Sequence, residues 1–351
     1  MKKHLLVIEK LAPSWFACVM GTGIVAITSF YYSQNFLWLR NLSTLLWILN
    51  VLLFALLIIP WTLRLFIYRE KALSDLREPT TGQFYATMPI SCLVLAADFL
   101  IIGTHSMDIN LAIGLAKGLW ILGTLIAVLF AVIIPMQNIL NPDVRVENIS
   151  PAWFMPPVGL IVIPISGAKL IPYWPDSWQQ IMLILNYVFW GSGFFLFLFI
   201  EAICIYRFIC RPPLPGHLAP TIWINIGPIG AGTIALINLS YASTPFLGES
   251  VVPVLNLFAI FFWGFGFWWI INAVLLTIFY FKQNNLPFSL SWWAFTFPLG
   301  AYTGATYLIA SFVKSPAVNI YGFCCYLLLL FVWLCVFVRT IIGVGRMEFF
   351  K

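Results

Sequence analysis

The stretch WAFTFPLG, residues 293–300, places a proline and a glycine inside an apolar run. Proline removes a backbone hydrogen bond from a helix and clashes with the preceding turn, so it interrupts regular helix. Four other stretches hold a helix-disrupting residue in a similar setting: FACVMGTG (16–23), FYATMPIS (84–91), AWFMPPVG (152–159) and WINIGPIG (223–230). The disrupting residues are separated by 68, 68, 71 and 70 positions: Gly21, Pro89, Pro157, Pro228 and Pro298. A recurring period of this kind indicates a repeated structural unit.

The composition places this repeat in a membrane. Hydrophobic residues make up 62% of the 351 residues and charged residues only 9%, whereas soluble domains carry about 25% charged residues. A helix needs about 20 mostly apolar residues to cross the hydrocarbon layer. We predict an all-α membrane protein, a single domain over 1–351, with ten spans near 13–32, 42–63, 84–103, 111–134, 153–171, 181–206, 219–241, 252–279, 292–312 and 318–342.

The period of about 70 residues corresponds to two spans with their loops, so the chain is predicted to form five tandem helical hairpins. The odd-numbered spans then all run in the same direction, with their disrupted positions at a similar depth. Interrupted helices are tolerated in lipid only where they are buried or line a water-filled cavity. We therefore expect a ring in which the odd spans line a central pore and the even spans lie outside.

Gly21 and Gly23 also match the letters of a dinucleotide-binding loop, G-x-G-x-x-A. That motif requires a strand before it, a helix after it and an acidic residue about 20 positions later. Here the glycines lie inside an apolar run, and the next acidic residue after Glu9 is Glu70. We interpret the two glycines as the first copy of the helix break.

The basic residues predict the orientation in the membrane. With the N-terminus in the cytoplasm, 14 Lys and Arg residues fall on the cytoplasmic side and three, Arg40, Lys169 and Lys314, fall outside. Positive residues concentrate on the cytoplasmic side of membrane proteins. Both termini are therefore expected in the cytoplasm of a cell whose inner or plasma membrane holds the protein, with an uncleaved first span. The net charge of +6 then reflects topology rather than nucleic-acid binding.

The residue types favour anion transport over catalysis. The seven cysteines include no C-x-x-C pair and the three histidines are scattered, so we expect no metal, no cofactor and no catalytic residues. An intramembrane enzyme, the remote alternative, would need a convergent cluster of acid, base, nucleophile or metal ligands. The outer half-helices beyond the breaks would present their positive N-terminal ends to the pore, which favours an anion.

Three ionisable residues are expected at membrane depth. Hairpin geometry puts Asp98 and Lys117 at matching depth, and intramembrane charges are generally paired or functional. We favour a structural pair and keep a role in proton or anion coupling as the alternative. Glu201, near the cytoplasmic end of the sixth span, is expected to meet Arg207, water or lipid headgroups.

The opening APSWFACVMGTGIVA, the five hairpins with prolines in the odd helices, and SWWAFTFPLG in the ninth span resemble the tellurite-resistance/dicarboxylate transporter family. That family includes a plant guard-cell slow anion channel, a yeast malate permease and a yeast sulfite efflux pump. The resemblance covers essentially the whole chain. It implies transport of a C4-dicarboxylate such as malate, or of sulfite, with a tellurite-resistance-type halide or nitrate channel as the alternative.

The resemblance also implies site residues and an assembly. A phenylalanine of the ninth helix obstructs the pore in that family, and alignment through T-F-P puts it at Phe297, with Phe295 as competitor. Phe16 and Met20 resemble other pore-facing positions. The expected partners are a small anion, the lipid bilayer and, by resemblance, two further copies of the chain in a homotrimer with one pore per subunit.

Overall fold

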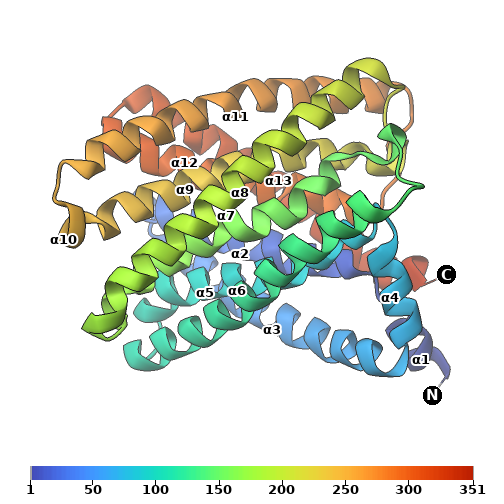
Figure 1. Ribbon diagram of the computed structural model, residues 1–351, viewed down its shortest axis with the longest axis horizontal. Coiled ribbons are helices and arrows are strands. Elements are labelled where there is room, and N and C mark those ends of the chain that lie inside the picture. Colours follow the sequence, from blue (N-terminus) through green and yellow to red (C-terminus); the bar gives the residue numbers. More distant parts are fainter. Residues whose placement is uncertain (1, 351) are drawn as a thin grey trace.

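Every regular element is a helix in the part of the chain that the structure describes. The computed structural model describes the backbone of residues 2–350 and the side chains from residue 6 onward. Lys2, Lys3 and Lys351, which entered the charge count, therefore lie outside the described side chains. Long helices lie side by side along the longest axis of the molecule, and both ends of the chain are at the same end of the bundle (Figure 1).

Five segments share one construction, in which a short 3₁₀ helix leads into an α-helix. We call them the inner segments. They are η1 (Pro13–Phe16) with α2 (Ala17–Tyr32), η2 (Gly82–Ala86) with α5 (Thr87–Ile101), η5 (Pro151–Phe154) with α7 (Met155–Leu170), η7 (Gly216–Asn225) with α9 (Ile226–Ala242), and η8 (Leu290–Phe295) with α12 (Phe297–Val313).

A longer helix follows each inner segment, and we call these the outer helices. They are α3 (Trp38–Ile67), α6 (Ile109–Leu140), α8 (Asp176–Cys210), α11 (Val251–Lys282) and α13 (Pro316–Gly345). The remaining elements are short: α1 (Lys2–Glu9), α4 (Arg69–Arg77), η3 (Gly103–His105), η4 (Val146–Asn148), η6 (Ile171–Tyr173), α10 (Thr244–Leu247) and η9 (Glu348–Phe350).

Burial separates the two sets. Within the apolar cores of the first four inner segments 78% to 94% of residues are buried, against 22% to 33% for the outer helices. The outer helices carry most of the exposed large apolar side chains, such as Leu56, Leu125, Phe199, Phe261 and Phe331. In water such a surface would be unstable, so it is the surface that lipid covers.

Nine helical stretches in the described chain are long and apolar enough to cross a membrane. The ninth predicted span, residues 292–312, is not among them. Thr296 separates η8 from α12, and α12 alone has 17 residues. This segment nevertheless packs along α2, α9 and α13, and its two helices together cover Leu290–Val313.

The inner α-helices contact one another in a closed circuit. Helix α2 contacts α5, α5 contacts α7, α7 contacts α9, α9 contacts α12, and α12 contacts α2. Each outer helix packs on the inner helix of its own hairpin, as α3 does on α2 and α13 on α12. Close approach within the circuit requires small residues. A Cβ atom at Gly230 of α9 would lie 2.3 Å from the backbone nitrogen of Tyr302 in α12.

The four repeated prolines interrupt regular helix in a different way from a kink, because each lies near the start of an α-helix that follows a 3₁₀ helix. Pro89, Pro157 and Pro228 are each the third residue of an α-helix, and Pro298 is the second residue of α12. Proline is tolerated in the first turn because the backbone N–H that it lacks has no intrahelical acceptor there. The repeat thus marks the position at which 3₁₀ helix becomes α-helix. Gly21, the corresponding residue of the first copy, lies slightly further along, as the fifth residue of α2.

Candidate functional site

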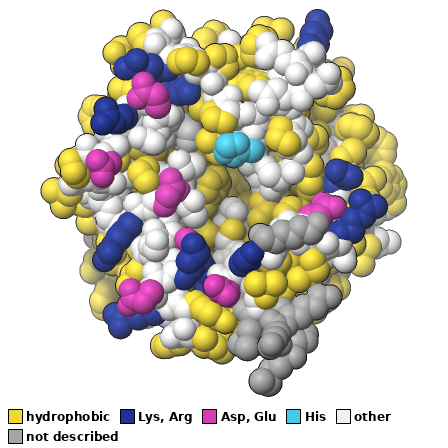
Figure 2. All heavy atoms as spheres, turned by 90° about the vertical axis from the view of Figure 1, so that its right-hand side faces the viewer, with side chains coloured by type: hydrophobic (Ala, Val, Ile, Leu, Met, Phe, Trp, Pro, Cys, Tyr) yellow, Lys and Arg dark blue, Asp and Glu magenta, His cyan; other side chains and the backbone are white. Residues whose placement is uncertain are grey.

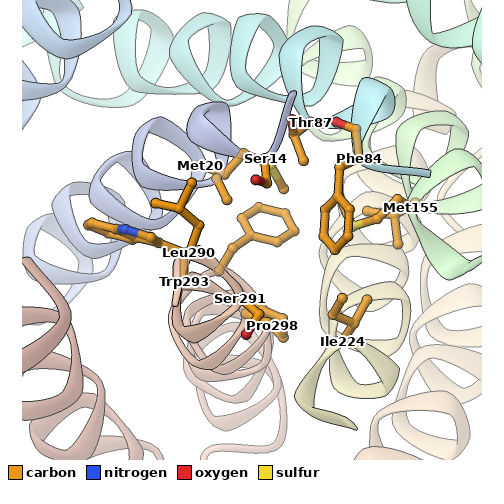
Figure 3. A pocket seen from close by; sticks show the side chains of 15 residues that line it. Ser14, Met20, Phe84, Thr87, Met155, Ile224, Leu290, Ser291, Trp293 and Pro298 are labelled. Atoms are coloured by element: carbon orange, nitrogen blue, oxygen red, sulfur yellow. Dashed lines mark hydrogen bonds between the residues drawn. The ribbon is translucent and has the colours of Figure 1, made fainter. Parts of the chain in front are cut away.

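A cavity lies at the five junctions between 3₁₀ and α-helix. It encloses, together with its open mouth, about 450 Å³. Figure 3 shows side chains from all five inner segments around it, among them Met20, Phe84, Met155, Ile224 and Pro298. The complete set of residues around it is Ser14, Ala17, Met20, Phe84, Thr87, Met155, Val158, Ile224, Gly227, Leu290, Ser291, Trp293, Ala294, Phe297 and Pro298.

Most of these residues are spaced three apart in the sequence. The first inner segment contributes Ser14, Ala17 and Met20, and the fifth contributes Ser291, Ala294 and Phe297. The other three segments contribute one pair each: Phe84 and Thr87, Met155 and Val158, and Ile224 and Gly227. A 3₁₀ helix has three residues per turn, and positions i and i+3 of an α-helix also share a face. One continuous face of each inner segment therefore borders the cavity.

The wall of the cavity is apolar except for three hydroxyl groups. Thr87 donates its hydroxyl hydrogen to the backbone, with the Pro13 and Phe84 carbonyls both 2.7 Å away. Ser291 donates to the His217 carbonyl at 2.6 Å. The Ser14 hydroxyl makes no hydrogen bond within the described residues, and it is therefore free to donate to a molecule in the cavity. None of the residues around the cavity carries a formal charge.

Phe297 and Phe295 lie in different surroundings. Phe297 borders the cavity and is 5% exposed. Phe295 instead packs edge-on against Trp223 and Trp292, with ring centroids 5.5 Å apart in both pairs. An aromatic cluster of this kind holds η8 against η7. Of the two candidates, only Phe297 is placed where a side chain could obstruct the cavity.

Several residues predicted to face a pore do not border this cavity. The Phe16 ring lies 5.6 Å from the Trp61 ring and 6.0 Å from the Phe54 ring, both on the outer helix α3. Phe16 immediately precedes Ala17, which rotates it about 100° away from the cavity face. The prolines of three copies, each the third residue of its α-helix, also do not border the cavity: Pro89, Pro157 and Pro228.

The two glycines of α2 also serve packing. A Cβ atom at Gly21 would lie 2.2 Å from Oγ1 of Thr296, so glycine is required for the contact between α2 and the start of α12. A Cβ atom at Gly23 would lie 2.6 Å from Nδ2 of Asn50 and 2.9 Å from Oδ2 of Asp98. Gly23 thus makes room for a buried polar pair between α3 and α5.

Asp98 and Lys117 do not form the pair that we favoured from the sequence. Asp98 is fully buried, and its Oδ2 accepts a hydrogen bond of 2.9 Å from Nδ2 of Asn50. Lys117 donates to the carbonyl of Tyr173 and lies 4.9 Å from the centre of the Trp174 ring. Equal depth in the membrane does not bring the two side chains together. Asp98 is directed toward α2 and α3, whereas Lys117 is directed toward Tyr173, in the turn between α7 and α8.

Glu201 also has a partner that the sequence did not indicate. Its Oε1 accepts a hydrogen bond of 2.6 Å from the indole N–H of Trp269, and the residue is 5% exposed. Arg207 instead donates from Nη1 to the carbonyl of Pro212 at 2.8 Å. The hydrogen bond to Trp269 joins the outer helices α8 and α11.

The helix dipoles end at a different depth from the one that we expected. At the junctions the backbone amides are already hydrogen-bonded, for example Ala17 to Ser14, Thr87 to Phe84 and Met155 to Ala152. The α-helices therefore present no free N-terminal end at this depth. Their dipole continues through the 3₁₀ helices, so its positive end lies at Pro13, Gly82, Pro151, Gly216 and Leu290. The direction is unchanged and still favours an anion at the end of the bundle that carries the termini.

Sequence reasoning missed most of the cavity wall, including Ser14, Phe84, Thr87 and Met155. The signal was present in the spacing. In four of the five copies, positions three residues apart that include the first residue of the α-helix, Ala17, Thr87, Met155 or Phe297, border the cavity; in the fourth copy the face is shifted by one residue, to Ile224 and Gly227. The prediction instead followed the most conspicuous residues, the prolines. Among the described residues no group of His, Cys, Asp and Glu could hold a metal ion.

A bundle of buried, punctuated helices inside an apolar outer layer, with a cavity at its centre, defines a helical membrane transporter. The chain belongs to the voltage-dependent anion channel family, whose model matches residues 10–341.

Three relatives illustrate the range of this similarity. The chain is 42% identical over 350 residues to an uncharacterized transporter of Methanocaldococcus jannaschii, covering 100% of this chain and 98% of the relative. It is 27% identical over 363 residues to a sulfite efflux pump of Arthroderma benhamiae, covering 99% and 94%. It is 24% identical over 319 residues to a malic acid transport protein of Schizosaccharomyces pombe, covering 88% and 73%. These relatives are transporters, so the chain is not an enzyme.

Proposed function

We propose that the cavity is part of a path along which small anions cross the membrane. The observation that carries this proposal is that all five inner segments contribute side chains to one uncharged cavity. Helix dipoles with their positive ends at the mouth would attract an anion, and a wall without fixed charge would release it. Conduction requires this combination of weak attraction and easy release.

In the proposed arrangement the inner segments form a ring and Phe297 closes it. The circuit of contacts from α2 through α12 supports the ring, in which η8 and α12 together form the ninth of ten crossings. The Phe297 ring lies next to Pro298 on the cavity wall, among apolar side chains. A hydrophobic constriction excludes water and ions until it widens. Phe297 therefore acts as the obstruction on the path.

Sulfite is the substrate that we propose first, with a C4-dicarboxylate such as malate second. The alignment to the sulfite efflux pump covers 94% of that relative, against 73% for the malic acid transport protein. A halide or nitrate channel of the tellurite-resistance type remains the alternative, and the uncharged wall is the observation that favours it.

The test is flux through purified protein in liposomes. Vesicles would be assayed with labelled sulfite, malate, chloride and nitrate, at equal amounts of folded protein. We expect sulfite to cross at least several times faster than malate, and faster than in protein-free vesicles. Malate crossing faster than sulfite would reverse the order of substrates, and no anion flux above the protein-free control would contradict the proposed path.

We also propose that both termini face the cytoplasm and that three chains assemble. The two ends of the chain lie at one end of the bundle, and charged side chains gather on that face (Figure 2). Positive residues mark the cytoplasmic side. Cysteines introduced at Arg40 and Lys314 should react with a membrane-impermeant reagent in intact cells, and a cysteine at Arg77 should not. The mass of the purified complex tests the trimer.

A further inference from the structure

A second concave feature lies on the outer surface, between the outer helices α8 and α11. It is a groove of about 1150 Å³, measured with its open side, and it ends at the last turns of both helices. Its floor is Ile222 of η7. The groove shares no lining residue with the cavity, so the proposed anion path does not account for it.

The groove has one polar end and a long apolar wall. Arg207 and Arg211 stand at the polar end, where α8 finishes. The wall is formed by apolar side chains of α11, including Trp268, Leu275 and Phe279, which are 46%, 59% and 40% exposed. A molecule that fills the groove must therefore combine a negative group with a hydrocarbon chain.

Arg207 is the unusual residue of this groove. It is 4% exposed, and its Nε atom is buried without a hydrogen-bond partner in the described structure. One Nη atom donates to the carbonyl of Pro212 at 2.8 Å, and the residue forms no salt bridge with a described carboxylate. A buried guanidinium group with an unused donor is costly unless an acceptor reaches it. The groove is the space from which an acceptor could come.

The nearby acidic residues do not neutralise Arg207. Glu201, nearly two turns earlier on α8, accepts from Trp269. Glu147 pairs with Arg211 at 3.1 Å, and both side chains of that pair are exposed, at 53% and 43%. Exposed pairs of this kind contribute little stability and exchange partners readily. The lining of the groove therefore contains two basic residues, Arg207 and Arg211, and no acidic one, while Glu147 pairs with Arg211 from outside it.

We propose that this groove binds one anionic phospholipid. The phosphate accepts hydrogen bonds from the guanidinium groups of Arg207 and Arg211, and one acyl chain lies along the wall formed by α11. Planar guanidinium groups match phosphate oxygens in pairs, and basic pockets between membrane helices bind anionic headgroups. The hydrogen bond of Tyr280 to the Leu214 carbonyl, 2.9 Å long, fixes the segment that closes the groove below the headgroup.

The experiment is native mass spectrometry of the purified protein titrated with phosphatidylglycerol or phosphatidylcholine. We expect one phosphatidylglycerol per chain to bind about tenfold more tightly than phosphatidylcholine, because the phosphate of phosphatidylcholine is already neutralised by its own choline ammonium group. Arg207→Gln should remove that preference. Arg339→Gln is the matched control, because Arg339 also lies near the end of an outer helix but outside the groove. Millimolar inorganic phosphate should not compete, because it has no acyl chain.

A second variant covers the case in which Arg207→Gln does not fold. Leu276→Trp fills the apolar wall and leaves both arginines in place. It should weaken phosphatidylglycerol binding several-fold without changing the mass of the assembly. Equal binding of both lipids, or equal effects of the Arg207 and Arg339 variants, would overturn the proposal. A loss of assembly in both groove variants, with lipid binding unchanged, would assign the groove to a second copy of the chain instead.

Discussion

The inner segments and the outer helices are both apolar, yet they are built differently. The inner segments contain the repeated prolines at the start of their α-helices, and 78% to 94% of the residues in the apolar cores of the first four are buried. The outer helices are longer, and about a quarter of their residues are buried. Lipid chains are as apolar as leucine, so hydrophobicity alone does not decide which helix lies inside. The inner segments differ from the outer helices in their repeated change from 3₁₀ helix to α-helix, which each inner segment makes near its proline or glycine.

The largest change in stability should come from adding a methyl group to a glycine of the inner layer, with a glycine of the outer layer as the comparison. Gly230→Ala puts a Cβ atom 2.3 Å from the backbone of Tyr302, whereas Gly264 of α11 has nothing within 4 Å. A backbone atom cannot move aside as a flexible side chain can, so Gly230→Ala should lower the free energy of unfolding by on the order of 3 kcal/mol. Gly264→Ala should be neutral or slightly stabilising. Thermal unfolding in detergent measures both, and equal stability of the two variants would mean that the inner circuit is not tightly packed.

A smaller effect is expected at the buried acid of the inner layer. Asp98→Leu leaves the Asn50 amide without its acceptor and should destabilise by about 2 kcal/mol. Asp98→Asn retains an acceptor and should be close to the wild type. Lys117→Gln, on the outer helix α6, should also change little. A large loss of stability in Lys117→Gln would instead support a coupling between the two residues that the observed contacts do not contain.

Phe297→Ala should raise anion flux per folded molecule by about tenfold, the change given by removing roughly 1.4 kcal/mol of barrier. Phe295→Ala should lower the yield of folded protein and leave the flux per molecule unchanged, because Phe295 packs on Trp223 and Trp292. Liposome flux normalised to folded protein compares the two. An increase confined to Phe295→Ala would move the obstruction two residues upstream.

The smallest effect concerns the hydroxyl groups of the cavity. Ser14 has no hydrogen-bond partner in the described chain, whereas Ser291 donates to the carbonyl of His217. If Ser14 donates to a passing anion, Ser14→Ala should lower the flux about fivefold, equivalent to about 1 kcal/mol. Ser291→Ala should have less effect on flux. Comparable losses in both variants would indicate that the hydroxyl groups act on the shape of the cavity rather than on the anion.

The apolar runs and their period were sufficient to predict helices, hairpins and a membrane setting. A span of about 20 apolar residues must satisfy its own backbone hydrogen bonds in lipid, so its conformation follows from local composition. The repeated prolines also located the 3₁₀ to α junctions to within a few residues, since proline is acceptable in a first helical turn. These features depend on short stretches of chain and need no knowledge of neighbouring helices.

The tertiary structure alone decided which side chains meet. One residue along a helix turns a side chain by about 100°, so Phe16 packs on α3 while Ala17, the next residue, borders the cavity. For the same reason, Asp98 accepts a hydrogen bond from Asn50 and does not pair with Lys117. The sequence by itself determined the helices, their repeat and the membrane class. The rotation of each helix, and with it the wall of the cavity, followed from packing between segments far apart in the chain.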